Sequence, residues 1–268
     1  MSILQSRNPA MQVLENEDVL TVERSSVMTL GGTITATGIL LSIVTVVGVL
    51  VWQAINSYFV ANMDIPGWAW PAAIGSMIAG VVISFIIYKA PKIAPVLAPA
   101  HAVLEGVFVG AATFVIPLQF MGFDPATGKN PGSMLALQAA GATLAITAAM
   151  LAGYATGILR VGALVQKIMI TAVIGLIGYT ALLWILSFVG VGIWNGYQDT
   201  GMMGIGFTVL CAGLASLFLL LDFQYIEAGV QNRAPKYMEW VGAWGLMVTL
   251  VWLYIELLRL LAKLQSRD

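Results

Sequence analysis

Seven long apolar segments, separated by short polar connections, constrain the fold more than any other feature of the chain. An α-helix needs about 20 apolar residues to cross the hydrocarbon core of a bilayer, and each segment is long enough. The segments cover residues 33–56, 68–88, 99–121, 135–158, 168–190, 203–227 and 238–261. Only 9% of the residues are charged, whereas roughly 25% are charged in a soluble domain. The sequence therefore predicts an all-α membrane protein, a seven-transmembrane-helix bundle.

The chain divides into a polar tail, residues 1–27, and a transmembrane domain, residues 28–268. The tail lacks the basic start and short apolar core of a cleavable signal peptide, so we expect it to remain as a solvated tail. The net charge of −1 excludes a broad basic surface for nucleic acid. The single cysteine, Cys211, cannot form a disulfide within the chain.

Basic residues in the connections predict the orientation, because they concentrate on the cytoplasmic side. The tail and the second, fourth and sixth connections carry eight of them, so we expect the N-terminus to be cytoplasmic. Seven spans then place the C-terminus outside, together with the other four bases, which include Arg259, Lys263 and Arg267. These C-terminal bases oppose that placement, and a re-entrant last helix is the alternative.

Two acids lie inside the apolar segments, Glu105 in the third and Asp222 in the sixth. A charged carboxylate at membrane depth is costly, so such a residue faces the bundle interior and suggests a functional site. Counting from Pro99 and from the exit near Gly229, each acid lies roughly 10 Å from the cytoplasmic face. No base is expected beside them. The two acids can be protonated, share a proton or bind a hard cation such as Ca²⁺, or they can be held neutral by hydrogen bonds in the bundle.

Five further polar residues are weaker candidates for accessory roles. Glu239 occupies the first turn of the last segment, where the helix dipole favours a negative charge. Glu256 precedes Arg259 by three residues, a spacing that permits an ion pair on one helix face. His101 shares a face with Glu105 four residues later, but its place near the start of the segment predicts solvation.

The fifth accessory candidate, Glu227, lies near the bases Arg233 and Lys236, and we expect it to be solvated. Small residues recur every fourth position in Gly106-x-x-x-Gly110 and Gly75-x-x-x-Ala79, a pattern typical of closely packed membrane helices.

Motifs for catalysis are missing from the sequence. One histidine cannot supply a usual zinc site, and neither a nucleophile elbow nor a phosphate-binding glycine loop with lysine occurs. We therefore expect a protein that is not an enzyme and carries no cofactor.

The last two segments and the N-terminal part of the chain contain distinctive motifs. In the last two segments these are Leu221-Asp222-Phe223-Gln224-Tyr225-Ile226-Glu227, Ala234-Pro235-Lys236-Tyr237-Met238-Glu239-Trp240 and Val248-Thr249-Leu250-Val251-Trp252-Leu253-Tyr254-Ile255-Glu256-Leu257-Leu258-Arg259. Near the N-terminus they are Asn8-Pro9, Met28-Thr29-Leu30-Gly31-Gly32-Thr33 and Thr37-Gly38-Ile39-Leu40-Leu41. Together these motifs resemble the bacterial branch of the Bax inhibitor-1 family, and the resemblance covers nearly the whole chain.

The resemblance implies seven helices with the last one central, surrounded by the other six. It also implies a pH-sensitive Ca²⁺ leak of the bacterial inner membrane, gated by two aspartates that share a proton. The first of these maps onto Asp222. The second position, ten residues before Arg259, is Thr249 in this chain. Thr249 can hydrogen-bond to Asp222 but cannot share its charge, so Glu105 is our candidate for the second acid.

The sequence thus predicts a pH-sensitive cation leak channel, with Asp222, Glu105 and Thr249 as its gate and Asp222 and Glu105 as tentative Ca²⁺ ligands. The main rival is a non-conducting regulator that binds membrane proteins such as a quality-control protease, for which the mixed charge of the tail is suited. A proton-coupled transporter is a third interpretation.

Overall fold

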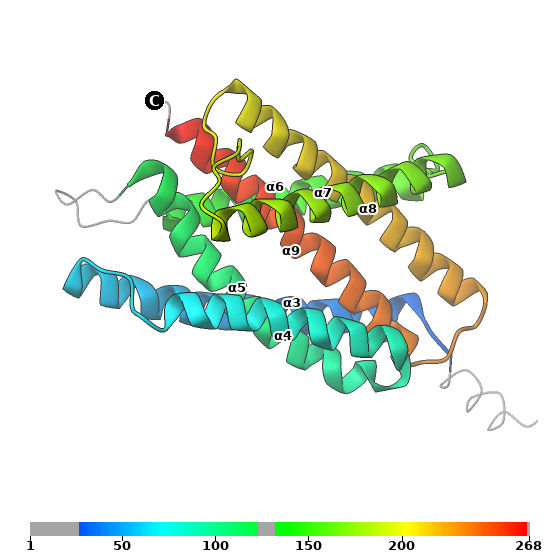
Figure 1. Cartoon of the computed structure of the whole chain (residues 1–268). Coiled ribbons are helices and arrows are strands. Elements are labelled where there is room, and N and C mark those ends of the chain that lie inside the picture. Colours follow the sequence, from blue (N-terminus) through cyan, green and yellow to red (C-terminus); the bar gives the residue numbers. More distant parts are fainter. Residues whose placement is uncertain (1–26, 123–131, 267–268) are drawn as a thin grey trace, which may run out of the picture.

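The computed structural model describes residues 27–122 and 132–266, which form seven long helices and one short 3₁₀ turn (Figure 1). The tail that the rival interpretation invokes lies almost wholly outside these residues. The helices are α3 (Leu30–Asn62), α4 (Ala69–Lys89), η1 (Pro91–Ile93), α5 (Ala94–Met121), α6 (Gly132–Ala155), α7 (Ala163–Phe188), α8 (Met202–Gln231) and α9 (Met238–Gln265).

Each of the seven predicted spans corresponds to one helix, so the predicted fold class is confirmed. All seven are long and apolar enough to cross a membrane. The largest difference in boundary is at α3, which continues six residues beyond the predicted end, to Asn62. Helix α5 begins five residues before the predicted start because Pro99 lies inside the helix. Pro95 lies in the first turn of α5, where the missing N–H has no helical partner in any case.

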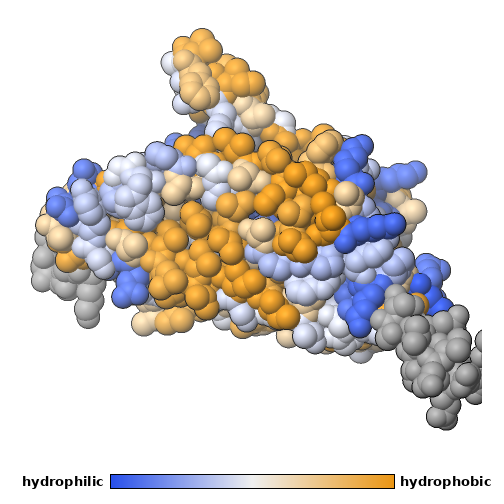
Figure 2. Space-filling view, turned by 90° about the horizontal axis from the view of Figure 1, so that it is seen from below, coloured by the Kyte–Doolittle hydropathy of each residue, from blue (hydrophilic) through white to orange (hydrophobic). Residues whose placement is uncertain are grey.

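The helices alternate in direction, which places their connections at two ends of the bundle (Figure 1). One end holds the start of α3 and the connections 90–93, 156–162 and 232–237; we call it the N-terminal face. The other end holds the connections 63–68 and 189–201 and the end of α9; we call it the C-terminal face. The space-filling view in Figure 2 shows an apolar band between hydrophilic ends, as a bilayer-spanning surface requires.

Helix α9 is the central helix, as expected, and it has the largest buried share of the seven. It packs mainly against α3, α5, α6 and α8. The outer helices α4 and α7 pack mainly on α5 and α8 respectively. The expectation that all six other helices surround α9 is therefore corrected to four. The reason is that α4 lies against α5 and α7 against α8, so both lie outside the four helices that pack on α9.

The closest helix contact joins α3 and α5 and depends on the predicted Gly106-x-x-x-Gly110 pattern. A Cβ on Gly110 would lie 2.5 Å from the carbonyl oxygen of Gly48 and 2.8 Å from Cβ of Val51. The Gly75-x-x-x-Ala79 pattern has a different outcome, because a Cβ on Gly75 would have no atom within 4 Å. Only the first pattern is a packing contact.

Candidate functional site

Asp222 lies on α8, nine residues before the end of the helix, and faces α9. A Cβ on Gly245 of α9 would lie 3.8 Å from Oδ1 of Asp222. The side chain of Thr249, one turn further along α9, lies within hydrogen-bonding reach of the carboxyl. Among the described residues Oδ2 of Asp222 is buried without a hydrogen-bond partner, and no base forms an ion pair with it. The predicted neighbourhood of Asp222 and Thr249 is therefore present in the fold.

The hydroxyl of Thr249 can donate one hydrogen bond, and two alternative acceptors lie around it. The hydroxyl donates to the carbonyl oxygen of Gly245 at 3.2 Å, within the same helix. A carboxylate at Asp222 is the alternative acceptor, and a protonated Asp222 can instead donate to the hydroxyl. The threonine can therefore respond to the protonation state of Asp222 without carrying charge.

Glu105 lies on α5 beside His101, in a cavity of about 190 Å³ formed by α4, α5 and Val248 of α9. Oε1 of Glu105 is 4.0 Å from Nε2 of His101, and the glutamate side chain is 20% exposed. His101 is buried, its Nε2 is 3.0 Å from Oγ of Ser84, and its ring meets Trp244 edge-on at 6.0 Å. The expectation that His101 is solvated is wrong, because α4 and α9 cover the start of α5.

Glu105 and Asp222 lie at the same level of the bundle but on neighbouring faces of α9. Their α9 neighbours, Val248 and Thr249, are consecutive residues, whose side chains diverge by about 100° around a helix. No hydrogen bond or ion pair joins the two acids within the described part of the chain. Counted from the observed helix ends, both are roughly 15 Å from the N-terminal face, deeper than expected.

Glu227 and Glu239 have partners that their sequence positions did not indicate. Glu227 accepts hydrogen bonds from the phenol of Tyr154 on α6 and from Gln231, rather than pairing with the nearby bases. Glu227 is half-buried, because α6 packs against α8 at this level, so it keeps part of the expected solvation. Glu239 is buried and accepts from the backbone N–H of Thr29 at 2.9 Å and from its hydroxyl at 2.8 Å.

Glu239 therefore lies at two helix starts at once, those of α3 and α9. The unpaired N–H groups of both first turns favour its negative charge. Gly32 leaves the room for this contact, since a Cβ there would overlap the carboxyl group of Glu239. Glu239 is a structural clamp between the first and last helices.

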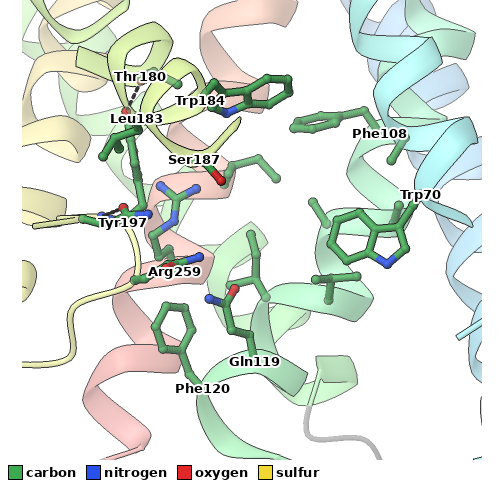
Figure 3. Close-up of a pocket in the computed structure, with 18 of the residues that line it drawn as sticks. Trp70, Phe108, Gln119, Phe120, Thr180, Leu183, Trp184, Ser187, Tyr197 and Arg259 are labelled. Carbon is green, nitrogen blue, oxygen red and sulfur yellow. Dashed lines mark hydrogen bonds between the residues drawn. The ribbon is translucent and has the colours of Figure 1, made fainter. Parts of the chain in front are cut away.

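The predicted pair of Glu256 and Arg259 is present, with Arg259 Nη1 2.7 Å from Glu256 Oε2. The guanidinium also stacks over the ring of Tyr197 at 4.7 Å. Figure 3 shows Arg259 and Tyr197 beside a cavity of about 510 Å³ near the C-terminal face, between α5 and α7. Trp184 and Phe108 face the same cavity from opposite sides (Figure 3).

Lys263 is the functional candidate that sequence reasoning missed. It was counted among the bases outside the membrane, but its side chain is fully buried in the protein. Its position seven residues after Glu256, which itself follows Thr249 by seven, was the available signal. Residues at this spacing share one helix face.

The connection between α7 and α8 closes over this end of α9. Asp199 in this connection accepts hydrogen bonds from the backbone N–H of Gly201 at 2.8 Å and from the indole of Trp194 at 3.0 Å. These donors hold the pKa of the Asp199 carboxyl below its usual value. Burial raises the pKa of the Tyr197 phenol in the same connection.

Within the described residues, no three side chains of histidine, cysteine, aspartate or glutamate gather as a metal site requires. Ca²⁺ takes six to eight oxygen ligands in proteins. Asp222 and Glu105 lie on different faces of α9, so they do not form one such ligand set in this conformation.

Comparison with known proteins supports the resemblance seen in the motifs. The sequence model of the family described as Bax inhibitor 1 like matches residues 5–266, nearly the whole chain. No curated protein and no solved structure gives a significant match.

Proposed function

The chain belongs to the Bax inhibitor 1 like family, and we propose that it is a pH-sensitive cation leak channel that passes Ca²⁺. The observation that carries the proposal is Asp222. Its carboxyl lies inside the bundle between α8 and α9, roughly 15 Å from the N-terminal face, with one oxygen buried and unpartnered among the described residues. A group in that position changes the local charge of the bundle whenever it binds or loses a proton.

Protonation would act through the packing of α9. An ionised Asp222 attracts cations and water to the α8–α9 contact, whereas a protonated one allows the contact to dry and tighten or to rearrange. Glu105 acts in the same way on the neighbouring face of α9, with His101 and Ser84 as its polar surroundings. The two acids would therefore bias one helix from two sides.

The direct test is Ca²⁺ flux into proteoliposomes measured across pH for the wild type, Asp222→Asn and Glu105→Gln. The neutral variants keep the side-chain shape, so the pH dependence of flux should weaken in each and disappear in the double variant. Asp64→Asn removes an acid from the exposed connection between α3 and α4 and should change nothing. Unchanged flux and pH profile in both single variants would refute the proposal.

The orientation belongs to the same proposal: a bacterial inner membrane with the N-terminal face in the cytoplasm. Its support is the distribution of bases, since Lys263 is buried and Arg259 is paired. Neither side chain is a free charge at the C-terminal face. Both therefore weigh less against this orientation than a simple count of basic residues on each side suggests. The bases at the N-terminal face are Lys89, Lys92, Arg160, Lys167, Arg233 and Lys236.

The rival function, a non-conducting regulator of a membrane protease, is separated by deleting residues 1–26. A regulator that binds partners through its tail should lose its cellular effect. A leak channel should keep most of its flux in proteoliposomes, because Asp222 and Glu105 lie in the bundle.

A further inference from the structure

A row of polar side chains continues from Asp222 to the C-terminal face along the contact of α8 and α9. On α9 it consists of Thr249, Glu256 and Lys263, which are all buried and follow one another every seven residues. On α8, which runs antiparallel, Asp222 faces Thr249 and Thr208 binds Lys263. Each step of seven residues advances about 10 Å along the helix. We call these five residues the polar seam.

Lys263 ends the polar seam in a site made of neutral oxygens. Its Nζ donates to the carbonyl oxygen of Gly196 at 2.7 Å, to Oγ1 of Thr208 at 2.9 Å and to the carbonyl oxygen of Gly204 at 3.1 Å. We call these three acceptors the oxygen cage. An ammonium group has three N–H donors, so the cage satisfies all of them. The ring of Phe120 lies 5.8 Å away on another side.

The charge of Lys263 is held without a direct counter-ion. Among the described residues no carboxylate lies within 4.0 Å of its Nζ. Carbonyl and hydroxyl oxygens are the groups that replace the hydration shell of a cation in protein sites. The chemistry of the cage is therefore that of a site for a small cation, whose occupant is part of the chain.

The direction of the side chain supports this reading over simple anchoring at the membrane surface. Lys263 lies two residues before the end of α9 at Gln265. Lysines near helix ends normally extend their ammonium group to the interface, where water solvates it. This lysine instead turns inward and is fully buried.

We propose that Lys263 is a tethered cation, which occupies a cation-binding site at the end of the polar seam and closes that end to free cations. The site would accept a primary ammonium ion best, because three acceptors match three N–H donors. The occupancy of the site stands independently of the proposed function, whereas the closure of a conducting path rests on it.

The occupancy is tested by chemical rescue of Lys263→Ala in detergent. Methylammonium should raise the Tm of this variant by about 3–6 °C at ten times its dissociation constant, relative to tetramethylammonium at equal ionic strength. Wild type should show no such difference, because its own ammonium fills the cage. Lys236→Ala removes a lysine at the opposite face and is the matched control. K⁺ alone is the second probe.

Removal of the Thr208 hydroxyl, one of the three acceptors of the oxygen cage, gives an internal check. The double variant Lys263→Ala with Thr208→Val should lose the response to methylammonium. If Lys263→Ala does not fold by itself, it is purified with methylammonium or tetramethylammonium present throughout. Recovery of folded protein with methylammonium but not with tetramethylammonium supports the site. Recovery with both compounds, or with neither, overturns it. A folded variant whose Tm responds to neither methylammonium nor K⁺ overturns it as well.

The closure is tested by flux in proteoliposomes. Lys263→Ala should leak cations several-fold faster than wild type, and methylammonium on the side of the C-terminal face should restore the wild-type rate. If wild type conducts and the variant conducts equally, the closure is refuted even when methylammonium raises the Tm. If neither conducts, the proposed function fails along with the closure, and the Tm response alone decides whether the cage is a cation site.

Discussion

The substitution Gly110→Ala tests the close backbone contact between α3 and α5. The added methyl group would lie 2.5 Å from the carbonyl oxygen of Gly48 and 2.8 Å from Cβ of Val51. Both are rigid parts of α3, so the two helices must separate locally. Overpacking of this kind costs about 1–3 kcal/mol, and contact with backbone and β-branched atoms places it in the upper half, at about 2–3 kcal/mol.

The assay is thermal unfolding of the purified protein in detergent. A loss of this size should lower the Tm by roughly 4–12 °C for a chain of this length. Gly141→Ala on α6 is the matched control, because a Cβ there would have no atom within 4 Å. Because alanine has a higher helix propensity than glycine, Gly141→Ala should raise the free energy of unfolding by at most about 1 kcal/mol. Equal Tm values for both variants would refute the α3–α5 contact.

Glu239→Ala should speed hydrogen exchange in the first turn of α3 about tenfold, because the N–H of Thr29 loses its acceptor and a hydrogen bond to a charged group contributes about 1.5–3 kcal/mol. Tyr154→Phe should lower the Tm by a few degrees, because the charge-assisted hydrogen bond from the phenol to Glu227 is lost. Asp199→Asn should flatten the acid side of the stability profile. The lowered pKa of Asp199 stabilises the fold above its unfolded pKa of about 4, and this contribution is lost as pH falls through the folded value.

Each of these variants has an internal comparison. Asp64→Ala removes an exposed acid at the other face and should leave exchange at the start of α3 unchanged. Tyr225→Phe removes an exposed phenol bonded to Gln166 and should leave the Tm unchanged. A wild-type profile in Asp199→Asn below pH 4, measured by the same thermal assay, would contradict the assigned hydrogen bonds.

The sequence predicted the location of buried charge in part. Asp222 and Glu105 were identified because an acid inside an apolar run is conspicuous, and both lie inside the bundle. His101 and Lys263 were placed in water because each lies near the end of a span. In the fold, α4 and α9 cover His101, and the connection 189–201 covers Lys263. Distance from a helix end therefore does not determine solvation once another element packs over that end.

The partners of the acids also depended on the fold. Glu256 and Arg259 are three residues apart on one helix, so local geometry was sufficient to predict their ion pair. Glu239 and Thr29 are separated by 210 residues, and their hydrogen bond exists only because the starts of α3 and α9 meet at one face. Asp222 and Glu105 share a depth, as helix length predicts, but α8 and α5 pack on different sides of α9, so the two acids meet different faces of that helix.

The sequence by itself determined the number of spans, their approximate limits and the fold class. In a bilayer the backbone must satisfy its own hydrogen bonds, so an apolar run of sufficient length has few alternatives to a helix. Only the tertiary structure decided which polar side chains of different helices and connections meet, including the polar seam and the oxygen cage around Lys263. Those contacts depend on the rotation and register of α9 against α8, and both are set by helix packing. Their only trace in the sequence is the seven-residue spacing of the polar residues on α9.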